Sequence, residues 1–247
     1  MADFSYIGKG KFLIAPYDAT GGLRPIGNVS NLEISVAEEE KFIGEFQSSG
    51  GGKANSIRRI TGVSLNVSMI DRIAENIALA FKGSTTSVTG AAVVSEVHKG
   101  WHGKYFVLDK PIGVTAIVVK DITDVTTYSA VTDYNVASDN SITVLSTGTI
   151  TDGQVLHVSY SFTVHNRIET LTNSGIEYKG VFMGLNEAQS DKQVIVTIHR
   201  LKFGAASAFA LISDDFSPMD IIGEALSDGT IVTAGLSKYF KVQQGEV

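Results

Sequence analysis

The chain has 247 residues, no cysteine and a formal net charge of −6, and its 43% of hydrophobic residues is enough to bury a sizeable core. The lack of cysteine excludes disulfides, thiolate metal sites and a cysteine nucleophile, and the absence of any basic cluster beyond Arg58 and Arg59 argues against a general nucleic-acid binder. No apolar stretch approaches the roughly 18 residues of a membrane span, and no signal peptide is recognisable, so we expect a soluble protein without an export signal.

Short runs of Val, Ile, Thr and Ser, separated by turn residues and many glycines, predict numerous short strands. The first is expected over Lys11–Tyr17, and a second within Val29–Phe46. The first half of the second segment alternates between two kinds of side chain, as expected for a strand with one buried face. The buried face would comprise Leu32, Ile34 and Val36, and the wet face Glu33, Ser35 and Ala37.

A glycine-rich segment, Gln47–Ser56, separates this strand from the next. Its three consecutive glycines have no side chains to pack and are costly to order, which predicts a flexible loop. Beyond it, Ile60–Met69 alternates again between apolar residues and Ser64, Asn66 and Ser68. The two strands and their loop are therefore expected to form a long hairpin.

One helix is predicted, over Asp71–Lys82. Its apolar residues Ile73, Ile77 and Phe81 recur every four positions and would form a stripe that packs on a sheet. Asp71 is expected to be the N-cap, and Gly83 to end the helix.

A polar linker, Ser84–Gly90, precedes a segment with its own aromatic residues and an even spacing of strands and turns. This rhythm is typical of a small β-sandwich. Its strands are expected at Tyr105–Leu108, Thr115–Lys120, Thr127–Ser129, Ser141–Leu145 and Val155–Val164.

The strand pattern of the first 90 residues returns after about residue 166, which predicts a β domain interrupted by a guest. The expected partition is a discontinuous domain over 1–90 and 166–247, with an inserted β-sandwich over 91–165. The later strands are expected at Ile176–Leu185, Val194–Phe203, Ala205–Ser213, Met219–Leu226, Ile231–Thr233 and Tyr239–Val242.

The sequence offers no recognisable catalytic or metal-binding constellation. The glycines before Lys53 fail the P-loop pattern, because Gln47 and Ala54 stand where a Gly and a Ser or Thr are required. His98 and His102 have metal-ligand spacing for a helix, but the glycines around them favour a polar turn. We therefore expect a protein that is not an enzyme and has no cofactor.

Several stretches together resemble the major tail tube proteins of long-tailed, siphovirus-type phages. LRPIGNVSN leads into the alternating acidic strand and glycine-rich loop, RITGVSLNVSMID leads into the helix ENIALAFKG, and FALISDDFSPMDIIGEAL resembles the closing strands. The resemblance covers roughly 1–90 and 166–247. The segment Gly103–Phe162 is similar to a small β-module of phage structural proteins and departs from the minimal tube pattern.

The resemblance implies a mainly β fold, a tail-tube-type β-sandwich or barrel with one packed α-helix, plus the inserted small β-sandwich. It implies self-assembly into hexameric rings that stack into a tube, whose lumen conducts DNA during ejection without specific binding. The implied partners are copies of itself and the tape measure, tail terminator and distal tail proteins, with no membrane. The implied location is the virion tail, assembled in the host cytoplasm.

Two surfaces follow from combining the resemblance with the strand pattern. The wet faces of the two hairpin strands would line an acidic lumen that repels phosphate. The glycine-rich segment would reach the next ring, where the adjacent Lys53, Arg58 and Arg59 would pair with acidic residues such as Glu38 to Glu40 of a neighbour. The lumen candidates are Glu33, Ser35, Ser64, Asn66 and Ser68. The inter-ring candidates lie in or beside Gln47–Ile57 and are Ser48, Ser49, Gly50, Gly51, Gly52, Lys53, Ala54, Asn55, Arg58 and Arg59.

Two other interpretations remain open. One is a β-sandwich binding or adhesion module, for which the aromatic residues of the inserted segment would serve. The other is a different phage tail or capsid protein. Rings or tubes of the purified protein would support the tail tube, whereas monodisperse monomers would support the binding module.

Overall fold

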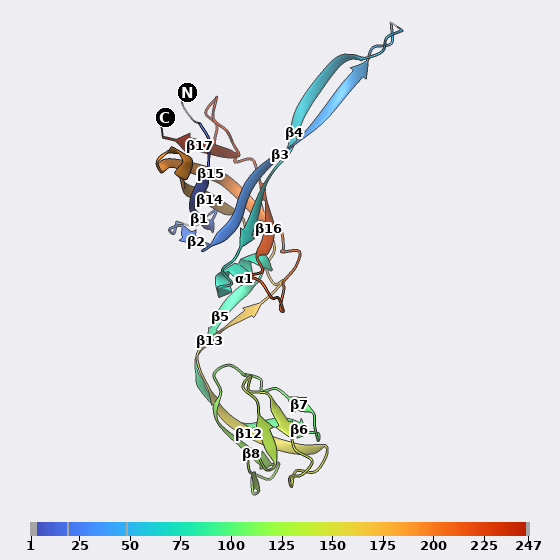
Figure 1. Cartoon of the computed structure of the whole chain (residues 1–247), viewed down its shortest axis with the longest axis vertical. Coiled ribbons are helices and arrows are strands. Elements are labelled where there is room, and N and C mark those ends of the chain that lie inside the picture. Colours follow the sequence, from blue (N-terminus) through green and yellow to red (C-terminus); the bar gives the residue numbers. More distant parts are fainter. Residues whose placement is uncertain (1–3, 19, 48, 246–247) are drawn as a thin grey trace. The chain divides into compact units, whose positions relative to one another are not determined.

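A computed structural model describes residues 4–18, 20–47 and 49–245. Strands account for 52% of the structure and helices for 4%, so the expectation of a mainly β fold is confirmed. The chain divides into two compact units (Figure 1). Unit 1 comprises Met1–Thr85 with Ile168–Val247, and unit 2 comprises Thr86–Arg167, within a few residues of the partition expected from the sequence.

Unit 1 is built on one eight-stranded antiparallel sheet with the order β2-β1-β14-β15-β16-β4-β3, in which β17 pairs with β15. Strand β1 pairs with β14 along its whole length, so strands from before and after unit 2 are direct neighbours. The elements of this unit are β1 (Gly8–Pro16), β2 (Arg24–Pro25), β3 (Val29–Gly44), β4 (Lys53–Met69), α1 (Ala74–Ala80), β14 (Tyr178–Asn186), the 3-10 helix η1 (Glu187–Gln189), β15 (Lys192–Phe203), β16 (Met219–Ala225) and β17 (Phe240–Gln244).

The sheet bends so that side chains from its two ends share one core. Phe12 on β1, Leu65 on β4 and Ile221 on β16 are each at most 2% exposed. Strand β16 alternates strictly between buried and exposed residues, as period 2 requires. Within it, Gly223 lies so close to Leu201 of β15 that a Cβ would sit 2.7 Å from the leucine Cδ1, which explains a glycine on the buried face.

Helix α1 is shorter than expected, and its predicted N-cap is wrong. The residue before it, Ile73, provides no side-chain cap. Asp71 instead accepts a hydrogen bond from the backbone N–H of Asn28 at 2.9 Å, because this carboxylate closes the turn that precedes β3.

The helix also ends two residues earlier than predicted, at Ala80 and not at Lys82. Lys82 takes the left-handed conformation, with φ of 48°, and the N–H of Gly83 donates to the carbonyl of Ala78 at 2.7 Å. This arrangement satisfies the last carbonyls of the helix in the manner of a Schellman motif.

The apolar stripe of the helix is only partly buried. Ile77 and Phe81 pack against the core, whereas Ile73 is 46% exposed. The buried Asn76 donates to the carbonyl of Ile26 at 2.6 Å and to that of Asp71 at 3.0 Å. This polar side chain therefore fixes the helix to the loop before β3.

The polar segment after the helix is a strand and not the expected linker. β5 (Ser84–Val88) pairs with β13 (His165–Glu169) in a separate two-stranded sheet. The chain therefore leaves unit 1 and returns to it along paired strands.

Unit 2 is a small β-sandwich, with a four-stranded sheet of order β6-β12-β8-β9 and a three-stranded sheet of order β10-β11-β7. Its own core includes Val119, Leu156 and Val158, all fully buried. The strands are β6 (Ala91–Gly100), β7 (Tyr105–Phe106), β8 (Thr115–Asp121), β9 (Thr127–Tyr128), β10 (Tyr134–Val136), β11 (Ile142–Val144) and β12 (Gln154–Phe162).

Two predicted strands of unit 1 are loops. Ala205–Ser213 and Ile231–Thr233 contain no strand. The guanidinium of Arg72 donates to the carbonyl of Ala210 in the first segment at 2.7 Å and to that of Ser217, just after it, at 3.0 Å. A side chain thus satisfies two carbonyls that strand pairing would otherwise satisfy.

Candidate functional site

Metal and membrane signals are missing from the part of the chain that the structure describes. Within residues 4–18, 20–47 and 49–245, no group of three or more His, Asp or Glu side chains is arranged to hold a metal ion. Among the same residues, no helix has the length and apolar character needed to cross a membrane.

The two histidines with metal-like spacing have separate structural partners. His98 lies on β6 and not in the expected turn. Its ring stacks on that of Phe106, with centroids 4.7 Å apart, and its Nε2 atom lies 2.6 Å from Glu96 Oε1. The Nε2 atom of His102 lies 2.8 Å from the carbonyl oxygen of Ile150.

The carboxylate of Glu96 ties a loop of unit 2 to its sheet. It accepts from the Tyr160 hydroxyl and from the backbone N–H of Asp109 at 2.9 Å. Burial and the hydrogen bond to Glu96 raise the pKa of Tyr160 to about 12, so the tyrosine stays protonated and donates at all ordinary pH values. These hydrogen bonds hold the loop against the sheet, so the cluster has a structural role.

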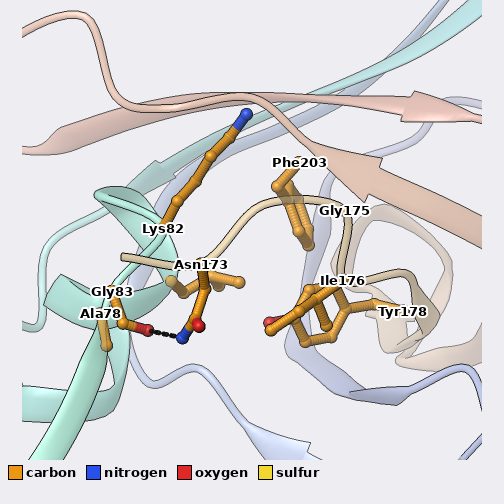
Figure 2. A pocket seen from close by; sticks show the side chains of 9 residues that line it. Ala78, Lys82, Gly83, Asn173, Gly175, Ile176, Tyr178 and Phe203 are labelled. Carbon is orange, nitrogen blue, oxygen red and sulfur yellow. Dashed lines mark hydrogen bonds between the residues drawn. The ribbon is translucent and has the colours of Figure 1, made fainter. Parts of the chain in front are cut away.

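Two hollows of unit 1, as far as its described residues line them, do not contain a catalytic arrangement. A pocket of about 30 Å³ lies beside α1, and there the Asn173 amide donates to the carbonyl of Gly83 at 2.9 Å. Figure 2 shows the side chains that line it. That volume holds only about one or two water molecules. A hollow of about 560 Å³ lies between β1 and the start of β3, and its ionisable side chains are Tyr6 and Lys9. It marks a gap between two strands that do not pair.

The five lumen candidates lie together on one face of the sheet. In the register of β3, β4 and β16, Glu33 is opposite Asn66, and Ser35 is opposite Ser64. Ser68 occupies the next row along β4. Because Val63, Leu65, Val67 and Met69 are buried on the other side, these polar side chains all point away from the core of unit 1.

Strand β16 extends this polar face with residues that the sequence pattern alone did not assign to it. Asp220 is opposite Ser68, Ile222 is opposite Asn66 and Glu224 is opposite Ser64. All three are exposed. Their period-2 pattern is visible in the sequence, but only the pairing of β16 with β4 places them beside the lumen candidates. We call the face formed by these three residues with the five lumen candidates the polar face.

Beyond the polar face, β3 and β4 continue as a paired hairpin that leaves the body of unit 1 (Figure 1). We call this extension, residues 36–62, the arm. Residues 53–59 belong to β4, so Lys53, Ala54, Asn55, Arg58 and Arg59 lie on a strand and not in a flexible loop. The connection between the strands is shorter than expected and contains Ser49 to Gly52; the candidate Ser48 lies outside the described residues.

The charged residues of the arm pair within one hairpin. Lys53 Nζ lies 2.7 Å from Glu40 Oε1, and Arg58 lies 3.9 Å from the same carboxylate. The hydrogen bond from Lys53 lowers the pKa of Glu40. Lys53 and Arg58 therefore have a partner within their own hairpin, and their expected pairing with Glu38 to Glu40 of a neighbour stays a prediction. Lys53 also does not have the setting of a P-loop lysine, since a strand and not a helix follows the glycines.

No second layer of described residues covers the arm. Its apolar side chains Phe42, Ile43, Phe46, Ile57 and Ile60 are all more than half exposed. Exposed apolar patches of this kind mark interaction surfaces.

The chain belongs to the family described as Protein of unknown function UCP028589, whose model matches residues 5–243. The match spans both units. No curated protein matches the chain.

Proposed function

We propose that the protein is the structural subunit of a phage tail tube, in which stacked rings of identical subunits enclose a lumen that conducts DNA during ejection. The observation that carries the proposal is the polar face, which adjoins a free sheet edge. Among the described residues, β3 pairs only with β4, so its other edge presents unpaired backbone groups over as many as 16 residues.

A long free edge favours association with another chain, because unpaired strand edges are prone to pair. If the edge of β3 pairs with a neighbouring copy, the polar face continues from subunit to subunit around a ring. The side chains on that face would then surround a common bore.

The chemistry of the polar face suits the passage of DNA. Glu33, Asp220 and Glu224 carry negative charge, and the serines and Asn66 are small and polar. Ile222 is the one apolar side chain among the eight residues. A basic residue, Lys202 of β15, lies at its border opposite Glu224. A surface with this excess of negative charge repels phosphates and does not hold them.

The arm supports the same proposal, because a projecting hairpin with exposed apolar residues can reach a subunit outside its own ring. The implied partners are further copies of this chain within hexameric rings, with tape measure, tail terminator and distal tail proteins at the tube's ends. The corresponding location is the phage tail.

Negative-stain microscopy of the purified protein over a range of concentrations tests the proposal. We expect rings or tubes with a central hole, and sedimentation of the protein at high concentration. Monodisperse monomers at every concentration and salt condition would contradict it.

A second candidate function concerns unit 2. Trp101 and Tyr105 lie outside its core and are 50% and 70% exposed, which favours a binding or adhesion module. Binding of the whole protein to bacterial surfaces or glycans, and its loss in Trp101→Ala with Tyr105→Ala, would support this role. Equal binding by the doubly substituted protein would exclude these aromatic residues as the site.

A further inference from the structure

The loop between β15 and β16, residues 204–218, is held firmly at its base. Besides its bonds to Ala210 and Ser217, the Arg72 guanidinium lies 5.0 Å from the ring centroid of Phe209. Phe209 also packs edge-on against Phe81, with centroids 5.2 Å apart. We call this segment the anchored loop.

The tip of the anchored loop nevertheless presents large apolar side chains to solvent. Leu211, Ile212 and Phe216 are 81%, 96% and 92% exposed. A hollow of about 350 Å³ lies between the loop and the segment that contains Ile70 and Arg72. The backbone of the loop is ordered, although these apolar side chains are not buried within the chain. Such an exposed apolar surface is typical of a binding surface, because a partner that covers it would provide the missing burial.

The arm carries the complementary surface. Phe46, near its tip, is 89% exposed, and Phe42 and Ile43 are 60% and 65% exposed. Because large apolar side chains gain most from leaving water, these three would contribute strongly to a contact that covers them.

The charges of the two surfaces differ. The arm contains four cations, Lys41, Lys53, Arg58 and Arg59, and four carboxylates, Glu38, Glu39, Glu40 and Glu45, which gives a net charge of zero. The anchored loop contains Asp214 and Asp215 and no cation, a net charge of −2. Charge therefore opposes contact of the loop with its own copy and does not oppose contact of the neutral arm with the loop.

The two surfaces lie at opposite ends of β4. The hollow of the anchored loop includes Ile70, directly after the strand, whereas the arm's tip precedes its first residue, Lys53. The 17 residues of β4 span roughly 55 Å at about 3.3 Å per residue, so the two surfaces of one copy cannot meet. Contact between copies is therefore head-to-tail, and such heterologous contacts repeat along an axis.

We infer that the arm of one subunit binds the anchored loop of a second copy of the chain, with Phe46 and its neighbours packed against Leu211, Ile212 and Phe216. The inference rests on the proposed function, because it identifies the acceptor surface in the next ring.

Cross-linking tests the contact, because the natural chain has no cysteine and any introduced thiol is unique. Phe46→Cys and Ile212→Cys are made in separate proteins, mixed, allowed to assemble and treated with a short bis-maleimide. This reagent avoids the narrow geometry of a disulfide. We expect a cross-linked dimer in the mixture and none in either protein alone. Phe46→Cys mixed with Val232→Cys is the matched control and should not cross-link, since Val232 of unit 1 is 84% exposed, against 96% for Ile212.

Microscopy of the same samples separates this inference from the proposed function. Rings or stacked rings without a cross-link would overturn the contact and leave the tube intact as a proposal. A cross-link in either single protein would overturn it in favour of a contact between like surfaces. Monomers without cross-links would overturn both.

A second pair of substitutions measures the contact without a reagent. Leu211→Ser with Ile212→Ser changes only exposed side chains, so the subunit should keep its circular dichroism spectrum. We expect isolated rings in place of tubes. Tubes of normal length from this variant would contradict the inference.

Discussion

The hairpin of β3 and β4 has two halves that share the same backbone pairing and differ in everything around it. In the half nearest α1, residues 63–69 of β4 alternate between core and polar face. In the arm, the same two strands remain paired, yet the side chains of residues 53–61 are exposed on both faces. Backbone pairing alone therefore buries little apolar surface, and a second layer decides which side chains are covered. The arm's missing layer is the strongest structural reason to expect a partner.

The largest expected difference between the halves is in stability. Leu65→Ala removes a side chain that is 1% exposed, and should lower the free energy of unfolding of unit 1 by about 2–5 kcal/mol. Ile57→Ala, in the arm, should change it by no more than about 0.5 kcal/mol, because Ile57 is 55% exposed. Urea unfolding of the unassembled subunit, followed by circular dichroism, measures both. Similar losses for the two variants would show that the arm is packed on the body.

The second difference is in assembly, where substitutions in the arm should have a larger effect than substitutions in the half nearest α1. Phe42→Ser with Phe46→Ser should leave the subunit folded but raise the concentration needed for assembly at least about a hundredfold, since two buried apolar side chains contribute roughly 3 kcal/mol or more. Light scattering against concentration gives the value. Ser56→Ala, also on the arm, is the control and should assemble normally. Unchanged assembly of the double variant would remove the arm from the interface.

Local patterns in the sequence predicted the half of the hairpin that has a second layer. The alternation of Val63 to Met69 with Ser64, Asn66 and Ser68 indicated the strand and its polar side, because one buried face imposes period 2. The arm was predicted poorly. The glycines suggested a loop as far as Ser56, whereas β4 begins at Lys53, since pairing with β3 continues where no burial pattern remains.

Long-range contacts explain the other errors. Asp71 matched the rule for helix caps, but its carboxylate binds Asn28, 43 residues away in the sequence. Ala205–Ser213 had the composition of a strand, but Arg72 binds the carbonyls of its loop. For the candidate site, Asp220 and Glu224 were missed because the neighbour of β16 is β4, which no local pattern reveals.

The third expected difference concerns DNA. Ser64→Lys, Asn66→Lys and Ser68→Lys, combined, place cations on the polar face without burying them, so folding and assembly should persist. Tubes of this variant should bind DNA at least about tenfold more tightly at low salt, with affinity falling as salt increases. Ala54→Lys with Asn55→Lys and Ser56→Lys puts the same charge on the arm and should have a smaller effect on DNA within the bore. Equal DNA binding by the two variants would contradict the assignment of the polar face to the lumen.

The smallest expected difference is between two ion pairs. Arg200 donates to both carboxylate oxygens of Glu177, at 2.6 and 2.9 Å, whereas Lys53 makes a single contact with Glu40 in the arm. Hydrogen bonds from these cations lower the pKa of both carboxylates. A lowered pKa in the folded state stabilises the fold above the carboxylate's ordinary pKa, and this stabilisation is lost as the pH falls through the folded-state value.

Glu177→Gln should therefore lower the melting temperature of the subunit more than Glu40→Gln does, and more at neutral pH than at acid pH. Thermal unfolding at the two pH values measures this. A larger fall in melting temperature for Glu40→Gln would show that the ion pair of the arm stabilises the subunit more than the ion pair of Glu177 and Arg200 does.

A cryo-electron microscopy reconstruction of the assembled protein tests most directly whether the polar face lines the bore of a tube made of identical subunits. We expect stacked rings in which Glu33, Asn66 and Asp220 face the lumen. A reconstruction with these residues on the outer surface, or images that contain only separate subunits, would contradict the account.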